Sequence, residues 1–89
     1  MLQVLYQKRF LKDLADIPRK HRKEIEDFVF NVLPNAKSFA GLHKFEKMTG
    51  YEDCFKARFG HYRIGAIYKN DVLELKRVLH RKEIYRYFP

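Results

Sequence analysis

The sequence predicts an α+β domain: an N-terminal strand, a helical hairpin, then an antiparallel β-meander with a short C-terminal segment. Two observations support this fold class. Apolar residues recur at helical spacing between residues 10 and 33, and from residue 51 onward they alternate as in strands. Because no linker rich in Gly, Pro or Ser divides the 89 residues, we expect one domain over 1–89.

The N-terminal elements are a strand over residues 2–6 and a helix after it. Val4 and Tyr6 share one face of the strand, and Leu5 lies on the other. Pro18 closes the helix or opens the next one. The apolar residues of this first helix are Phe10, Leu11, Leu14 and Ile17.

The second helix has the clearest periodicity, at positions i, i+3, i+4, i+7 and i+8. On its polar side we expect ion pairs between Lys20 and Glu24 and between Lys23 and Asp27. Pro34 ends it, and residues 35–50 form a less regular connection. The apolar positions of the helix are Ile25, Phe28, Val29, Val32 and Leu33.

Three strands are predicted over residues 51–59, 62–68 and 72–79, with turns at Gly60–His61 and Asn70–Asp71. One face carries an apolar row for the helices to cover. The opposite face carries Lys56, Arg58 and Arg63, and we expect it to stay open because both helices lie on the other side. The apolar row consists of Phe55, Ala57, Phe59, Tyr62, Ile64, Ala66 and Tyr68.

The charge distribution favours a polyanionic partner. The formal net charge is +8, from 19 Lys and Arg against 11 Asp and Glu. Residues 54–69 carry five basic or titratable cationic residues and no acid, and a second cluster follows over 80–85. Because phosphates neutralised by Lys or Arg release counterions, nucleic acid is the favoured partner, although a basic surface also serves solubility.

Several other classes of function lack support. Cys54 is the sole cysteine, which excludes an intrachain disulfide and fits a reducing cytoplasm, and no apolar run predicts a signal peptide or a membrane span. The four histidines show no metal-ligand spacing, and no glycine-rich phosphate loop occurs. We therefore expect a cytoplasmic protein without metal or cofactor.

The basic segments contain the groups that RNA cleavage by the substrate's own 2′-hydroxyl requires: a base, cations for the phosphorane and an acid for the leaving oxygen. The candidates are Lys56, Arg58, His61, Arg63, His80, Arg81 and Tyr85. Lys56, Arg58, Lys69 and Lys82 are the candidates for RNA binding. Alternatively, the strand cations form a solvated face, His61 is an exposed turn residue and Tyr85 packs the tail onto the sheet.

The order of these motifs resembles the RelE/ParE toxin superfamily over nearly the whole chain. The segments that carry the resemblance are FLKDLADIP, RKEIEDFV, LHKFEKMTG, CFKARFGHYRIGAIYK and HRKEIY, of which KARFGHYRIGAIY and HRKEIY are the most specific. The resemblance implies a RelE-like fold and a toxin of a type II toxin–antitoxin system. RelE-like members cleave mRNA in the ribosomal A site without metal, whereas ParE-like members inhibit DNA gyrase.

The resemblance also implies roles for individual residues. Arg63 matches the arginine that contacts the scissile phosphate, Arg81 the arginine that serves the leaving group, and Tyr85 the tyrosine that stacks on an mRNA base. Lys56 and Arg58 fall where RelE-like toxins carry two basic residues on one strand, one of them a lysine proposed as the general base.

The general base stays open because Arg58 occupies the place of that lysine, and an arginine hardly ever loses its proton. His61, His80 and Lys56 are the alternatives. The expected function is a ribosome-dependent mRNA endonuclease held inactive by an acidic antitoxin. Its rivals are a ParE-like gyrase inhibitor and a non-catalytic RNA-binding module.

Overall fold

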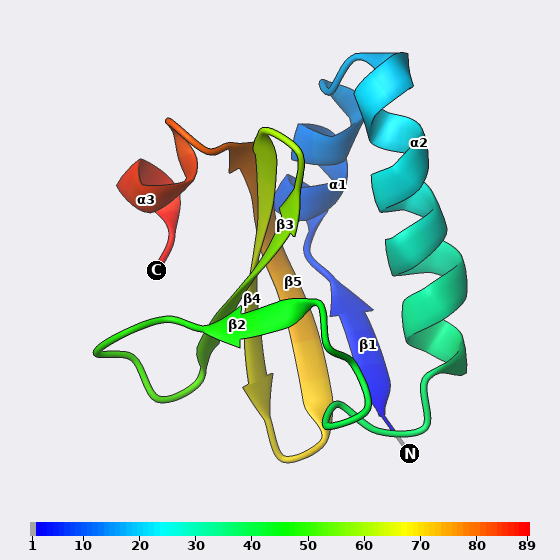
Figure 1. The fold of residues 1–89 in the computed structure, drawn as a ribbon, viewed down its shortest axis with the longest axis vertical. Helices are drawn as coiled ribbons and strands as arrows, with labels where there is room; N and C mark the ends of the chain where they lie inside the picture. The colour runs from blue at the N-terminus through cyan, green and yellow to red at the C-terminus, as the bar shows by residue number, and fades with distance from the viewer. Residues whose placement is uncertain (1) are drawn as a thin grey trace.

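A computed structural model, which describes residues 2–89, confirms the α+β class (Figure 1). Helices α1 and α2 cover one face of a five-stranded sheet, and the short α3 lies on the opposite face. In chain order the elements are β1 (Gln3–Tyr6), α1 (Lys8–Ala15), α2 (Arg19–Asp27), the π-helical turn η1 (Phe28–Val32), the 3-10 turn η2 (Leu33–Asn35), β2 (Phe45–Lys47), β3 (Cys54–Phe59), β4 (Tyr62–Lys69), β5 (Val72–His80) and α3 (Ile84–Tyr87).

The sheet has the strand order β1-β5-β4-β3-β2, in which β1 runs parallel to β5 and the other neighbours are antiparallel. The predicted meander of β3, β4 and β5 is confirmed, and β2 extends it by one strand that the sequence did not reveal. Three residues are too few to show the alternation of a strand. The pairing of β1 with β5 joins the two ends of the chain, which local periodicity does not predict.

Both predicted hairpin turns are present, and their backbone explains their residues. Gly60, between β3 and β4, has a φ of 59°, and Asn70 and Asp71, between β4 and β5, have φ values of 52° and 63°. Positive φ is open to glycine and is tolerated best by Asn and Asp among other residues. These tight turns keep β3, β4 and β5 adjacent, which fixes which side chains share a face.

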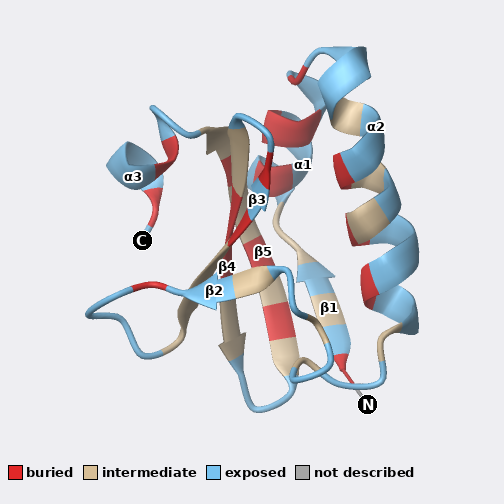
Figure 2. Ribbon diagram, viewed as in Figure 1, coloured by how far each residue is buried: buried red, intermediate tan, exposed pale blue. Residues whose placement is uncertain are grey.

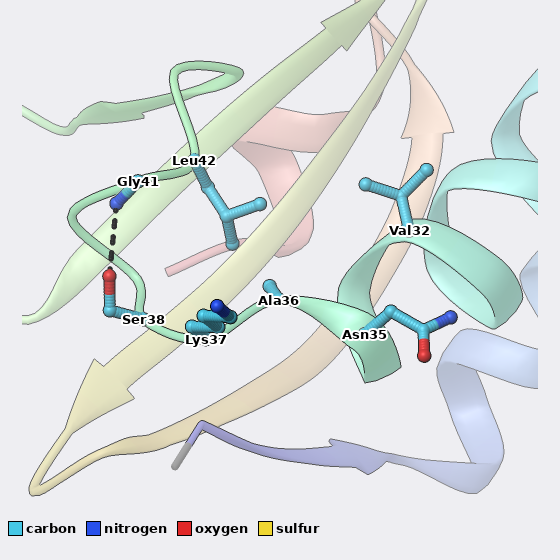
Figure 3. Close-up of a pocket in the computed structure, with 7 residues that line it drawn as sticks. All are labelled: Val32, Asn35, Ala36, Lys37, Ser38, Gly41 and Leu42. Carbon is cyan, nitrogen blue, oxygen red and sulfur yellow. Dashed lines mark hydrogen bonds between the residues drawn. The ribbon is translucent and has the colours of Figure 1, made fainter.

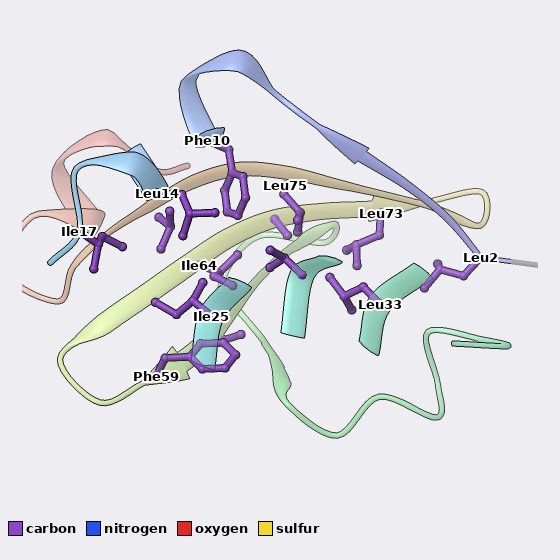
Figure 4. Close-up of a cluster of buried hydrophobic side chains, with 14 residues drawn as sticks. Leu2, Phe10, Leu14, Ile17, Ile25, Leu33, Phe59, Ile64, Leu73 and Leu75 are labelled. Carbon is purple, nitrogen blue, oxygen red and sulfur yellow. The ribbon is translucent and has the colours of Figure 1, made fainter. Parts of the chain in front are cut away.

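The main hydrophobic core fills the space between the sheet and the helices α1 and α2 (Figures 2 and 4). Phe10, Ile25, Ile64 and Leu75 are fully buried there. Burying a side chain of this size contributes about 1.5–3 kcal/mol. The core therefore lies where the helical and strand periodicities placed it.

Two residues of the predicted helical core, Leu11 and Val32, are instead exposed by 41% and 43%. Leu11 follows Phe10 by one position, so it lies about 100° around the helix axis from the buried side. Val32 ends the π-helical turn η1, whose wider winding changes the helical phase and turns Val32 outward, whereas Leu33, also a predicted core position, is fully buried.

The ion pair on α2 also differs from the prediction. Among residues 2–89 it joins Arg22 to Glu26 at 3.5 Å, and neither of the two expected lysine pairs forms. Arg22 also donates to the carbonyl oxygens of Ala15 and Ile17 at 3.0 and 3.4 Å, so it closes the connection between α1 and α2. Exposed lysines gain little from pairing, because solvent screens the attraction and ordering two side chains costs entropy.

No helix in the described part of the chain is long and apolar enough to cross a membrane.

Candidate functional site

Strands β3 and β4 bring cationic residues together on the face opposite the main core. Arg58 lies directly across from Arg63, and Lys56 across from Gly65. The alternate pair Ala57 and Ile64 points into the core and is fully buried. The predicted separation of cationic and apolar residues onto opposite faces of the sheet is thus correct. We call the surface formed by Lys56, Arg58 and Arg63 the basic face.

The expectation that this side of the sheet stays open is wrong, because α3 packs over part of it. Ile84 and Phe88, one helical turn apart, are buried with Met48 in a second, smaller core. The ring of Phe88 lies on Gly65, where an added Cβ would be 2.5 Å from Cδ2 of that ring. The residues packed against this second core are Cys54, Ile67 and Leu79. The missing side chain of Gly65 therefore leaves the room in which α3 docks.

Tyr85 projects from α3 toward the basic face. The ammonium of Lys56 donates a hydrogen bond to the Tyr85 hydroxyl at 3.2 Å and lies 5.4 Å from the centre of its ring. The side chain of Tyr85 is 54% exposed. Ile84 and Phe88 anchor the tail, so the aromatic ring of Tyr85 stays available to a ligand.

Arg63 is held at the hairpin turn. Its Nη1 donates to the carbonyl oxygens of Gly60 and Tyr62 at 2.7 and 3.0 Å. A guanidinium has five N–H donors, so several remain for an anion. These backbone contacts fix the group in place before any ligand binds.

Arg58 has a carboxylate neighbour that the sequence did not suggest. Its Nη1 lies 3.8 Å from Oε1 of Glu46, and both side chains are more than half exposed. Glu46 reaches this face because β2 pairs with β3, where Glu46 lies opposite Lys56. The sequence could have placed Glu46 on this face only if β2 had been predicted as a strand. That segment is too short to show the alternation of a strand.

The two candidate histidines stack at one edge of the site. The rings of His61 and His80 are 5.8 Å apart at 19°. Burial, and then the positive charges of His61, Lys82 and Arg81, lower the pKa of the His80 imidazole, while Glu83 opposes the shift. Nδ1 of His80 accepts the backbone N–H of Lys82 at 3.2 Å. While the ring is neutral, this hydrogen bond leaves its proton on Nε2.

The remaining candidates divide by position. Arg81 follows β5 and its backbone N–H donates to the carbonyl of His61 at 2.7 Å, so the exposed Arg81 and Lys82 lie beside the histidines. Lys69 lies six residues from Arg63 at the other end of β4, about 20 Å away at roughly 3.3 Å per residue. The structure does not bring Lys69 to the basic face.

A surface cavity lies away from these residues (Figure 3). It has a volume of about 300 Å³ and includes none of the candidate residues. The residues that line it are Val32, Asn35, Ala36, Lys37, Ser38, Gly41 and Leu42. Within residues 2–89, no three His, Cys, Asp or Glu side chains gather closely enough to hold a metal ion. The groups that the structure describes at and beside the basic face are its cations, the two histidines, Tyr85 and Glu46.

The chain is similar in sequence to known toxins. A family model described as "ParE toxin of type II toxin-antitoxin system, parDE" matches residues 4–85. Toxin RelE3 of Methanocaldococcus jannaschii is 39% identical over 89 residues, which are 99% of this chain and 100% of that protein. The similarity therefore spans both proteins almost completely.

Solved structures are similar over the same extent. The toxin in the RelB–RelE antitoxin–toxin complex from Methanococcus jannaschii is 36% identical, with a TM-score of 0.75 over 96% of this chain and 99% of that one. The RelBE2 toxin–antitoxin complex from Mycobacterium tuberculosis has a TM-score of 0.69 at 22% identity, covering 90% and 98% of the two chains. The isolated E. coli RelE toxin has a TM-score of 0.65 at 19% identity, covering 90% and 84%. The last two establish similarity of fold alone.

Proposed function

This chain is a RelE-like member of the RelE/ParE superfamily of toxins of type II toxin–antitoxin systems, and we propose that it cleaves mRNA in the ribosomal A site. One observation carries this proposal. Tyr85, a residue suited to stacking on a base, contacts Lys56 on the same exposed face that holds Arg58 and Arg63. A single-stranded RNA on this face would meet cations and an aromatic ring at once.

The proposed reaction is an attack by the 2′-oxygen of the RNA on its own phosphate. A bond forms between the 2′-oxygen and phosphorus, the bond to the 5′-oxygen breaks, and the products are a 2′,3′-cyclic phosphate and a 5′-hydroxyl. Arg63, already oriented by the carbonyls of Gly60 and Tyr62, would stabilise the additional negative charge of the phosphorane. The proton of the 2′-hydroxyl goes to a base on the protein, and the 5′-oxygen receives one from an acid.

The geometry narrows the assignment of these two proton transfers. Nδ1 of His80 is occupied by the N–H of Lys82, and the lowered pKa of the ring disfavours the imidazolium that would donate a proton, so His80 is a weak candidate for both transfers and Arg81 is the proposed partner of the leaving oxygen. Arg58 is a poor acceptor because a guanidinium keeps its proton. The proton acceptors that remain are His61, Lys56 and Glu46. Each is substituted in turn, and we expect substitution of the base to abolish cleavage while RNA affinity is kept.

We propose an acidic antitoxin as the partner. The net charge of +8 favours an acidic partner, and the relatives from Methanococcus jannaschii and Mycobacterium tuberculosis were solved as complexes with their antitoxins. An acidic segment laid on the basic face would neutralise Arg58 and Arg63 and block access to Tyr85. Because the substrate is translated mRNA, the proposed site of action is the cytoplasm.

A second candidate function is inhibition of DNA gyrase, the activity of ParE-like members of the superfamily, since the matching family model is described as a ParE toxin. Such a toxin acts by binding a protein. It has no need for a catalytic set, so in this case Lys56, Arg63 and Tyr85 would matter only as far as they contact gyrase.

Translation in a reconstituted system, followed by mapping of the mRNA 5′ ends, distinguishes the two. We expect cleavage at defined codon positions that leaves 2′,3′-cyclic phosphates and disappears in Lys56→Ala. Lys37→Ala, an exposed lysine in the distant cavity, is the matched control and should cleave as the wild type does. Intact mRNA together with trapped gyrase–DNA complexes would replace this proposal with the second one.

A further inference from the structure

We propose that Arg77 is a positioning residue that holds Tyr85 over the basic face by fixing α3 from β5, two strands away from Lys56 on β3. The proposal concerns the orientation of α3, and only its consequence for cleavage rests on the proposed function. Arg77 lies on β5 and belongs to none of the cationic groups assigned to RNA above. Its neighbours place it between α1 on one face of the sheet and α3 on the other.

Helix α3 contacts three strands through three aromatic side chains. Tyr85 meets Lys56 on β3, and Phe88 lies on Gly65 of β4. On β5, the guanidinium carbon of Arg77 lies 5.0 Å from the centre of the Tyr87 ring. Such a cation–π contact favours a Tyr87 ring whose face is turned toward the guanidinium, so it restricts where the ring can lie.

Arg77 is itself held rigidly. Its Nε and Nη2 donate to the two carboxylate oxygens of Asp13 on α1 at 2.6 and 3.2 Å, and Asp13 also accepts the backbone N–H of Val78 at 3.2 Å. The side chains of Arg77 and Asp13 are only 15% and 7% exposed. A two-point contact of this kind fixes the plane of the guanidinium, and with it the surface on which Tyr87 rests.

A bulge in β5 brings Arg77 into this position. Gly65 pairs with Arg77 whereas the next residue, Ala66, pairs with Leu75, so Lys76 is an additional residue in the ladder. A bulge increases the local twist and redirects the side chains beside it. The pairing of β1 with β5 ends at Leu75. Arg77 lies beyond this residue on β5, where β1 no longer pairs with it, and reaches Asp13 there.

The orientation of α3 depends on such contacts because the helix has only four residues. A helix this short has no stability of its own, so packing must set its rotation about its axis. Ile84 and Phe88 fix the side that faces the sheet. Loss of the Tyr87 contact at β5 would let α3 rotate about these anchors and would move Tyr85 away from Lys56 on β3.

A fluorescent reporter tests this orientation without any RNA. The chain has no tryptophan, so Tyr85→Trp introduces a unique fluorophore at the position in question. In that background we expect Tyr87→Leu and Arg77→Met to increase acrylamide quenching and to lower the anisotropy of the reporter. Arg86→Met, an exposed arginine of the same helix, is the matched control and should change neither.

Tyr87→Leu is the decisive variant because it keeps the pair of Arg77 with Asp13 intact and so preserves the fold even if Arg77→Met does not fold. A folded Tyr87→Leu protein with unchanged quenching and anisotropy would overturn the proposal. This outcome does not depend on whether the wild type cleaves RNA, so failure here is distinct from failure of the nuclease proposal.

Cleavage gives a second readout, with Tyr85 restored. We expect Tyr87→Leu to lower kcat by about 10- to 100-fold, as a misplaced catalytic contact does, with a smaller change in KM. In a Tyr85→Ala background the same substitution should have no further effect, because the residue that it positions is gone. Full additivity of the two losses would mean that Arg77 and Tyr87 act on cleavage by another route and would contradict the proposal.

Discussion

The two faces of the sheet differ in how they are covered. On the face beneath α1 and α2, Phe10, Ile25 and Ile64 are 0% exposed in one continuous core. On the other face, Ile84 and Phe88 of the α3 segment form a small core with Met48, and of the cations beside it Arg58 is exposed while Lys56 and Arg63 are half-buried. The difference indicates that one face determines the stability of the fold, while the other uses just enough packing to orient Tyr85 beside the cations.

The largest expected effect is on the well-covered face. Phe10→Ala should lower the free energy of unfolding by about 3–5 kcal/mol, because it removes a fully buried ring and leaves a cavity. Urea denaturation measures this loss. Leu11→Ala, on the exposed side of the same helix, is the control, with an expected loss of about 0.5 kcal/mol. Equal losses in the two variants would contradict the assignment of the core.

The next effect is on the lightly covered face. Gly65→Ala should destabilise by about 1–3 kcal/mol, since its Cβ would overlap the Phe88 ring and push α3 outward. We expect the loss of cleavage to exceed what unfolding explains, because Tyr85 moves with α3. Thermal unfolding and the cleavage rate, measured together, give the comparison.

Gly41→Ala is the matched control for this substitution. The nearest atom to its added Cβ is Ser38 Oγ at 3.6 Å, which is an ordinary contact. We expect it to retain wild-type stability and cleavage. A Gly65→Ala variant that behaves like Gly41→Ala would show that the position of α3 does not matter to the basic face.

A smaller effect is expected at the exposed pair of Arg58 and Glu46. Glu46→Gln should change stability by less than about 1 kcal/mol, because solvent screens the pair. Affinity for an RNA that lacks the reactive 2′-hydroxyl should rise, because Arg58 is freed for phosphate, and its salt dependence should steepen by about one counterion. Filter binding at several salt concentrations measures both.

Glu24→Gln, an exposed carboxylate on α2, controls for the change in net charge. Glu46→Gln must strengthen binding more than Glu24→Gln does, and weaker binding would contradict the role of Arg58. If Glu46→Gln binds more tightly and yet cleaves more slowly than the wild type, Glu46 is the proton acceptor.

The smallest effect concerns pH. The pKa of His80 is lowered in the folded protein, chiefly by burial, so near and below pH 6.5 the unfolded chain takes up a proton that the folded chain resists. His80 therefore lowers the stability of the wild type as the pH falls through this range. We expect the Tm of the wild type to fall more than that of His80→Gln as the pH is lowered from 7.5 to 5. The same comparison between the wild type and His43→Gln should show a smaller difference. A constant difference across this range would refute the environment assigned to His80.

Local periodicity predicted the parts of the fold that repeat over several turns or pairs. The buried positions Phe10, Ile25 and Ile64 follow from spacing, and both hairpin turns follow from residue types that tolerate positive φ. The strand alternation also placed Arg58 and Arg63 on one face, which the register confirms. The roles of these residues in RNA cleavage remain predictions.

The missed features depend on short segments or on long-range contacts. Strand β2 has three residues and α3 has four, so neither is long enough to show a hydrophobic period. Because these two elements were not predicted, the position of Glu46 and the second core were not predicted either. The bidentate contact between Asp13 and Arg77 joins positions 64 apart in sequence. Asp13 occupies a core-facing position of α1, and a buried carboxylate there signals a partner without identifying it.

The most direct test of the account measures chemistry and folding together on the basic face. Single-turnover cleavage of mRNA on programmed ribosomes should slow by about 10²–10³-fold in Arg63→Ala, the loss expected when a preorganised cation is removed from the transition state. Its Tm should remain within about 4–8 °C of the wild type, the shift that corresponds to 1 kcal/mol in a domain of this size. Cleavage by Arg63→Ala at the wild-type rate would contradict the claim that the basic face performs the reaction.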